Sequence, residues 1–180
     1  MRGAVQEDLR ARVLDYIQRH NTMTIATCEG NRPWAAAVFY THRAFVFYYL
    51  SDPNSDHSRH VAANPEVALA IHEDYRDWRE IKGVQIQGTA AMVTDPSEIE
   101  DAWRLYLAKY PFVENWLLRL ARPLGLGRLA RAAGDAVGDL ARRVGSVRFY
   151  RVAARRVLYT DNSMGFGHRE ELSLHGEEPS

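Results

Sequence analysis

Residues 47–65, FYYLSDPNSDHSRHVAANP, join an apolar strand pattern to a polar loop and then to the start of a helix. Hydroxyls, imidazoles, a guanidinium and the free N–H groups of a helix start are the groups that bind phosphate in proteins. The stretch therefore predicts an anion cradle, or, in the simpler interpretation, a solvated connection between a strand and a helix. The polar side chains that it offers are Ser51, Asn54, Ser55, His57, Ser58, Arg59 and His60.

Two further stretches have the character of strands that face a ligand. Residues 81–88, IKGVQIQG, carry a cation and two glutamines, and together with the loop they suggest a bound phosphorylated cofactor. Residues 34–40, WAAAVFY, place three alanines in a strand, although strands favour β-branched residues. Small side chains let a flat group approach the backbone, and the flanking aromatic residues supply stacking surface. Packing of a helix against this strand is the alternative interpretation.

Composition limits the function without deciding it. The chain has 180 residues, of which 46% are hydrophobic, and this suits one domain with a substantial core. No apolar run approaches the roughly 18 residues of a membrane span, and the N-terminus shows no secretory pattern. Cys28 is the single cysteine, so an internal disulfide or a cysteine-based zinc site is excluded. We expect a cytoplasmic protein.

Charge is balanced overall but uneven along the chain. Residues 113–156 hold 10 basic and 3 acidic side chains, although the formal net charge is zero. This segment could contact nucleic acid or an anionic membrane, but arginines also commonly solvate one face of a helix pair. We expect two short helices here that pack their leucines inward, and neither a nucleic-acid nor a membrane partner.

Hydrophobic periodicity predicts an α+β protein. An amphipathic helix is expected over residues 5–20, with Val5, Leu9, Val13 and Ile17 on its buried face. Gly30-Asn31 and residues 41–43 are the expected turns, Ala153-Ala154 a possible bulge, and Asp95 the start of a later helix. The result is an antiparallel split β-barrel of about six strands in one domain, 1–180, with a helical insertion at about 96–145 and an irregular tail at about 161–180. The expected strands are Thr22–Glu29, 33–40, 44–50, 67–72, 82–94 and 147–160, with a short helix at 58–63.

Other catalytic patterns are incomplete. Residues 125–130 match GxGxxA, but no strand precedes them, so the dinucleotide fingerprint lacks its context. His57 and His60 share a helical spacing without a carboxylate to complete a metal site, and a single axial histidine for haem would leave little trace. The serines lack a GxSxG setting. We therefore predict no metal.

The stretches quoted above, together with TIAT at 24–27 and TDNSMGFGHREEL at 160–172, resemble in their order the pyridoxamine 5'-phosphate oxidase-like, FMN-binding split-barrel family. The resemblance is strongest to its small bacterial flavoproteins, over about 20–112 and 146–172. It implies an FMN cleft at a homodimer interface. The cofactor-binding residues that it implies are Ala37, Val38, Phe39, Tyr40, Leu50, Ser51, Ser55, His57, Ser58, Lys82 and Gln85. It places Trp34, Asn162, Phe166 and His168 on the substrate side or in the partner subunit.

Departures from the oxidase pattern shape the expected function. Ala35 and Tyr40 stand where the oxidase has an arginine and a lysine, and Asp56-His57 replaces the Arg-Lys of its phosphate loop. The resemblance thus implies an FMN-dependent oxidoreductase acting on an unidentified small substrate rather than a pyridoxamine 5'-phosphate oxidase. The alternative is a flavin- or haem-binding protein without turnover of its own. Charge lost from the cradle could be restored by Arg59, His60 or Lys82.

Overall fold

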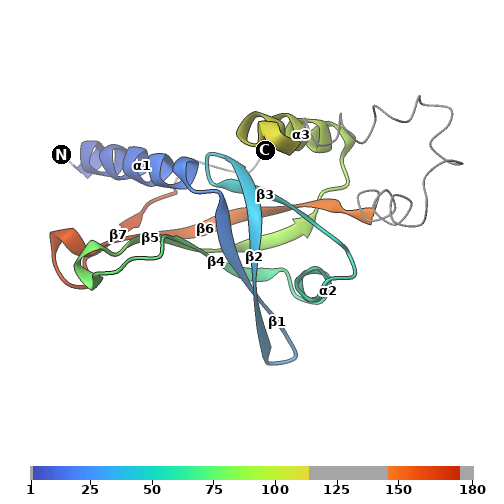
Figure 1. The fold of residues 1–180 in the computed structure, drawn as a ribbon, viewed down its shortest axis with the longest axis horizontal. Helices are drawn as coiled ribbons and strands as arrows, with labels where there is room; N and C mark the ends of the chain where they lie inside the picture. Colours follow the sequence, from blue (N-terminus) through green and yellow to red (C-terminus); the bar gives the residue numbers. More distant parts are fainter. Residues whose placement is uncertain (1, 114–145, 175–180) are drawn as a thin grey trace, which may run out of the picture.

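The computed structural model describes residues 2–113 and 146–174, in which an antiparallel barrel is flanked by helices (Figure 1). Its elements follow the periodicity of the sequence, because buried side chains recur every second residue in the strands. The elements are α1 (Arg2–Arg19), β1 (Thr22–Glu29), β2 (Arg32–Arg43), β3 (Val46–Ser51), α2 (Asp56–Ala63), β4 (Glu66–His72), η1 (Trp78–Glu80), β5 (Lys82–Met92), α3 (Pro96–Lys109), β6 (Arg148–Asp161), η2 (Asn162–Met164) and β7 (Arg169–Leu172).

The strands run in the order β3-β2-β1-β4-β5-β6-β7, and an additional pairing of β3 with β6 closes the first six into a barrel. The predicted α+β split barrel is therefore confirmed. β7 lies outside the barrel and pairs with the last part of β6, from Val157 to Thr160. The tail expected to be irregular thus contains a 3-10 turn and a short strand, which its alternating Arg169–Leu172 pattern was too brief to predict.

The two hairpin turns differ in how well the sequence marks them. Gly30 and Asn31 both have positive φ, 52° and 63°, and form the predicted turn between β1 and β2. The next turn was expected at residues 41–43, but β2 continues to Arg43 and the chain turns at Ala44, where φ is 48°. The His42 Nδ1 atom lies 3.0 Å from the carbonyl oxygen of Ala44, and this contact braces a turn that lacks a turn-forming residue.

A bulge lies close to where it was expected. Gln87 pairs with Arg156 and Gly88 with Ala154, so Arg155 is the extra residue of β6. At Gly88 the two backbones are so close that a Cβ atom would lie 2.3 Å from the Ala153 carbonyl oxygen. Glycine is therefore required at this position.

The main core fills the barrel and continues under α1. Leu9, Val13 and Ile17 are buried as predicted, but Val5 is 58% exposed because it precedes the part of α1 that lies on the barrel. A second cluster packs Ala102 and Tyr106 of α3 against Tyr48 and Phe149. α3 begins at the predicted Asp95 cap, whose side chain accepts a hydrogen bond from the Glu98 N–H.

Several predictions fall outside the described residues. These are the helix pair of the insertion, the GxGxxA match at 125–130 and the last residues of the tail, because the structure describes nothing at 114–145 or 175–180. Within residues 2–113 and 146–174, no helix is both long and apolar enough to cross a membrane. The same residues contain no group of three His, Cys, Asp or Glu side chains placed to hold a metal ion.

Candidate functional site

Three serine hydroxyls and one imidazole meet at the junction of β3 and α2. Ser51 Oγ lies 2.7 Å from His57 Nε2, 3.0 Å from Ser55 Oγ and 2.9 Å from Ser58 Oγ. Ser55 Oγ is also 2.9 Å from Ser58 Oγ and 3.3 Å from His57 Nε2. We call these four residues the cradle. Their polar atoms form one compact set, as the sequence predicted for this loop.

The cradle occupies the beginning of a helix. Ser55 is the N-cap of α2, but its side chain makes no capping hydrogen bond, because the hydroxyl is directed into the cradle instead. The first N–H groups of α2 therefore lack the partner that this residue type usually supplies. Burial lowers the pKa of His57 below its ordinary value, against a smaller opposing effect of Asp56, so the imidazole is favoured as neutral. The arrangement can accept an anion by exchanging its internal hydrogen bonds for bonds to the ligand.

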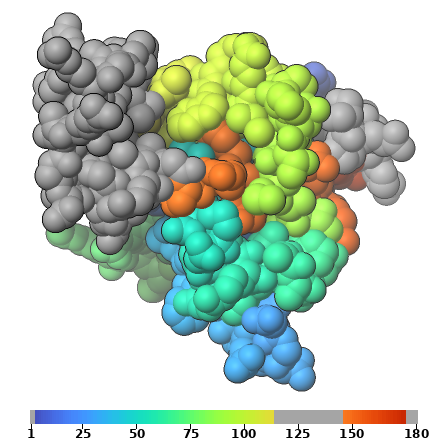
Figure 2. Space-filling model, turned by 90° about the vertical axis from the view of Figure 1, so that its right-hand side faces the viewer, coloured from blue at the N-terminus to red at the C-terminus, as the bar shows by residue number. Residues whose placement is uncertain are grey.

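The split in the barrel opens beside the cradle. β2 and β3 pair only as far as Tyr40 and Tyr49, and continued pairing would have placed Val38 opposite Ser51. The two strands part instead, leaving residues 32–39 of β2 paired only with β1. Figure 2 views this end, with α2 in teal beside the orange start of β6 and the blue β1–β2 hairpin below. Ala37, Val38 and Phe39 thus lie along one side of the split, and Leu50 and Ser51 along the other.

Tyr40 differs from the other predicted β2 residues. Its side chain is fully buried in the core, and its hydroxyl donates a 2.6 Å hydrogen bond to the Ile17 carbonyl. The inward face of β2 begins at this position, so its phenol is directed away from the split. Tyr40 can therefore contribute to a site at the split through its backbone alone.

The cations proposed to compensate for lost charge have other partners. Arg59 forms an ion pair with Asp56 and also bonds the Asn54 carbonyl at 3.3 Å. His60 Nδ1 lies 3.2 Å from Thr27 Oγ1, and its Nε2 lies 3.7 Å from a carboxylate oxygen of Glu29. Sequence reasoning missed Arg148, which is the cross-strand neighbour of Ser51 and adds positive charge at this edge. No local pattern could reveal it, because it belongs to a strand that begins about one hundred residues later.

Tyr49 is a second residue that the sequence did not point to. Its ring is fully buried, 6.2 Å from the His57 ring and stacked on Tyr150 at 5.4 Å. Its hydroxyl has no hydrogen-bond partner in the described part of the chain. Burial raises the pKa of this phenol, so it stays protonated and remains a potential donor. An unused buried donor is costly and often marks a functional site.

Lys82 lies at the opposite end of the barrel. It pairs with Asp161, the last residue of β6, whereas Arg148 beside the cradle is the first residue of that strand. The length of β6 separates the two ends by roughly 40 Å along an extended strand. Lys82 Nζ is engaged 3.0 Å from Asp161 Oδ2. The structure therefore does not bring Lys82 to the cradle of its own chain.

The predicted tail residues cluster near Lys82. Asn162 donates to the Trp78 carbonyl at 2.7 Å and accepts from the Gly167 N–H at 3.1 Å, which fixes the turn. Phe166 is 82% exposed and packs edge-on against Trp78 at 5.2 Å. His168 Nε2 lies 3.5 Å from a Glu170 carboxylate oxygen. These residues form an exposed aromatic end rather than part of the cradle.

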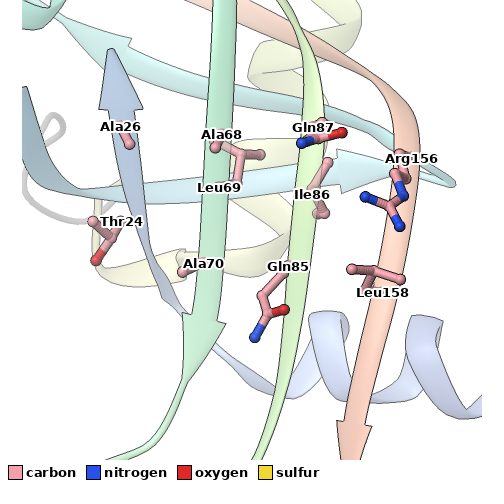
Figure 3. A pocket seen from close by; sticks show the side chains of 10 residues that line it. All are labelled: Thr24, Ala26, Ala68, Leu69, Ala70, Gln85, Ile86, Gln87, Arg156 and Leu158. Carbon is pink, nitrogen blue, oxygen red and sulfur yellow. The ribbon is translucent and has the colours of Figure 1, made fainter. Parts of the chain in front are cut away.

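Gln85 lies on the outer face of the sheet. A shallow cavity of about 310 Å³ crosses β1, β4, β5 and β6 there, and Figure 3 shows Gln85 and Gln87 projecting from β5 between the small side chains of β4 and Leu158 of β6. The floor is low because Ala26, Ala68 and Ala70 carry only a methyl group. Trp34 is 47% exposed and Phe39 45% exposed on the neighbouring β2. The face is flat and has room for a second surface.

Comparison with known proteins places this arrangement in a family. The sequence profile described as pyridoxamine 5'-phosphate oxidase matches residues 9–161. A UPF0306 protein of Photorhabdus laumondii is 31% identical over 75 residues, which cover 41% of this chain and 52% of that protein. The chain thus spans about half the length of that relative.

Solved structures share the fold at low sequence identity. An FAD-binding protein from Mesorhizobium loti matches with a TM-score of 0.57 and 14% identity, over 82% of this chain and 90% of that one. A haem-binding protein from Mycobacterium smegmatis matches with a TM-score of 0.62 and 17% identity, over 90% of this chain and 55% of that one. The profile covers most of the barrel, and its match shows that this chain belongs to the pyridoxamine 5'-phosphate oxidase family.

Proposed function

We propose that this protein binds FMN with the phosphate in the cradle and the flavin ring along the split beside β2. The observation that carries the proposal is the convergence of Ser51, Ser55, Ser58 and His57 at the start of α2, next to strands that part. Hydroxyls, an imidazole and free helix N–H groups fit a phosphate dianion. The family match and the flavin-binding relative of the same fold support this choice of ligand.

The described residues divide the work of holding the cofactor. Ser51, Ser55 and Ser58 would donate hydrogen bonds to phosphate oxygens, and His57 would do so more strongly once it is protonated. Ala37 and Val38 leave the edge of β2 open to a flat ring, and Leu50 borders it on the β3 side. A bound flavin supplies two-electron redox chemistry. We propose that the protein uses it as an oxidoreductase on a small, weakly charged substrate.

A homodimer is part of the proposal. Lys82, Gln85, Asn162, Phe166 and His168 lie too far from the cradle to act on the same cofactor within one chain. An antiparallel pair of protomers would bring one chain's aromatic end to the other chain's split. The flat outer face and its exposed aromatic residues are larger than a monomer usually leaves uncovered. Light scattering at micromolar concentration should give twice the chain mass, and a monomer would contradict this part.

Titration of the purified protein with FMN tests the binding proposal. We expect quenching of flavin fluorescence and a rise in thermal stability. His57→Ala or Ser55→Ala should each weaken binding by roughly tenfold to a hundredfold, because each removes a charge-assisted contact worth about 1.5–3 kcal/mol. His72→Ala, at an exposed position on β4, is the matched control and should bind as the wild type does. Absence of any response at saturating FMN would overturn the proposal.

A second candidate function is flavin or haem binding without turnover. The haem-binding relative of the same fold favours including haem among the ligands tested. Reduced FMN-loaded protein should be reoxidised faster by a specific acceptor than by oxygen if it is an oxidoreductase. We expect pyridoxamine 5'-phosphate to be a poor substrate, since Ala35 and Tyr40 supply no cation toward a substrate phosphate. Efficient formation of pyridoxal 5'-phosphate would restore the oxidase activity to first place.

A further inference from the structure

Only two of the 23 Lys and Arg residues in this chain are lysines, and the structure places them in opposite environments. Lys82 Nζ lies 3.0 Å from a carboxylate oxygen of Asp161, whose side chain is 6% exposed. This bond to Asp161 raises the pKa of Lys82, so its amine is held as an ammonium ion. Lys82 is thus a lysine whose lone pair is unavailable.

Lys109, the last residue of α3, has no such partner. Its Nζ donates a 2.7 Å hydrogen bond to the His20 carbonyl and lies 4.0 Å from the centroid of the Tyr40 ring. The titratable groups around it are Tyr40 and His42 of β2 and Tyr110, whose ring centroid is 5.8 Å away. No carboxylate within the described residues comes within ion-pair distance of this amine.

The environment favours the neutral amine. Burial lowers the pKa of Lys109 to about 8, and the positive charge of Lys109 in turn helps to lower the pKa of His42. The Tyr40 ring favours the ammonium ion, but a partly exposed contact of this kind is worth about 0.5–1 kcal/mol. That is less than the roughly 1.4 kcal/mol that moves a pKa by one unit. Burial therefore has the larger effect.

We propose that Lys109 is a nucleophilic amine and the site at which small acyl donors of the acyl-phosphate class modify this chain. The Nζ lone pair forms a bond to the acyl carbon, the bond from that carbon to the phosphate oxygen breaks, and phosphate leaves. The proton released from nitrogen passes to phosphate or water, and no oxidant or reductant is needed. The product is an uncharged amide that retains one N–H toward the His20 carbonyl.

The position gives such a modification a structural consequence. Tyr110, the next residue, donates hydrogen bonds to the carbonyls of Asn21 at 2.8 Å and Tyr40 at 2.6 Å. It also packs edge-on against Phe39 at 5.3 Å. Acylation therefore removes a charge from the contact that joins α3 to β2. The inference is independent of the proposed cofactor.

Brief treatment of the intact protein with acetyl phosphate at about pH 7.5, followed by peptide mass mapping, tests the proposal. A pKa near 8 leaves roughly a quarter of Lys109 amines free at that pH, against far fewer at Lys82. We expect acetylation of Lys109 to be at least about tenfold faster than that of Lys82. In concentrated urea the two rates should become similar, because both environments are lost.

The pH profile separates a nucleophilic lysine from one that is merely exposed. The Lys109 rate should level off above about pH 9, whereas the Lys82 rate should continue to rise beyond pH 10. Lys82→Arg should leave labelling of Lys109 unchanged, and Lys109→Arg should leave only the slow reaction. Equal rates in the folded protein, protection of Lys109 relative to Lys82, or a Lys109 rate that rises through pH 10 would each overturn the proposal.

Discussion

The two ends of the barrel hold their polar groups by different means. At the β3–α2 end, neutral hydroxyls and an imidazole bond to one another, and the net contribution of each such bond is only about 1 kcal/mol. At the other end, Lys82 and Asp161 form a largely buried ion pair, and removal of one partner from such a pair is strongly destabilising. A neutral cluster can exchange its bonds for a ligand, whereas the ion pair cannot. This difference is the reason to place the anion site at the cradle.

Gly88→Ala should have the largest effect, because the bulge near Gly88 joins the strands that connect the two ends. The added Cβ would lie 2.3 Å from the Ala153 carbonyl oxygen, and backbone on both sides must move to admit it. We expect a loss of about 3 kcal/mol or more in the free energy of unfolding, or failure to fold. Urea unfolding followed by circular dichroism measures the change.

Gly83→Ala on the same strand is the matched control. Its Cβ would meet the Ile71 carbonyl oxygen at 3.1 Å, which a small adjustment can relieve. We expect a loss clearly smaller than that of Gly88→Ala. Equal stabilities of the two variants would show that the strand pair is more adaptable than the close approach implies.

The two ends should also titrate in different pH ranges. Burial tends to raise the pKa of Asp161, but hydrogen bonds from Ser163 and Lys82 outweigh it, so the folded pKa lies below 3.8. The stability from Asp161 is therefore present above about pH 4 and lost as pH falls through the folded value. Burial lowers the pKa of His57 and His42 from 6.5, so folding stability is lost as pH falls below 6.5.

Urea midpoints between pH 8 and pH 3 check this contrast. At neutral pH, Asp161→Asn should cost about 2 kcal/mol, because Lys82 loses its partner, and the difference from the wild type should shrink below about pH 4. His57→Gln should instead flatten the wild-type loss between pH 6.5 and pH 5. Identical pH profiles for His57→Gln and the wild type would contradict the assignment of a buried neutral imidazole to the cradle.

The sequence predicted the fold better than it predicted the division of the site. Strand alternation and the Gly30-Asn31 turn gave most of the barrel, because these signals are local. The turn at Ala44 was misplaced because a side chain three-dimensionally close, His42, stabilises it. The gathering of Ser51, Ser55, Ser58 and His57 could be predicted, since all four come from one short loop.

Residues that meet only through the sheet could not be assigned in the same way. Lys82 looked like a cradle cation in the sequence, but strand register sets it against Asp161 at the far end. Tyr40 looked like a ring-lining residue, but the period of two along β2 turns its phenol into the core. Arg148 and Tyr49 became visible only when β6 and β3 were paired.

Tyr49→Phe should have the smallest effect on stability and the most informative sign. Tyr49 and Tyr40 are cross-strand neighbours, and both are fully buried, but only the Tyr40 hydroxyl has a partner, the Ile17 carbonyl at 2.6 Å. Removing the unpaired Tyr49 hydroxyl should leave stability unchanged or raise it by up to about 1 kcal/mol. Tyr40→Phe, the control, should lower stability by about 1 kcal/mol, because the Ile17 carbonyl loses its donor.

The same variant sharpens the comparison between the ends. If the Tyr49 hydroxyl is kept at the cradle end as a donor for a bound ligand or its water, Tyr49→Phe should gain stability without FMN and lose affinity for FMN. Tyr40→Phe should bind FMN as the wild type does, once its lower stability is taken into account. A Tyr49→Phe protein that is less stable than the wild type would show that this hydroxyl has a partner, and it would remove Tyr49 from the candidate site.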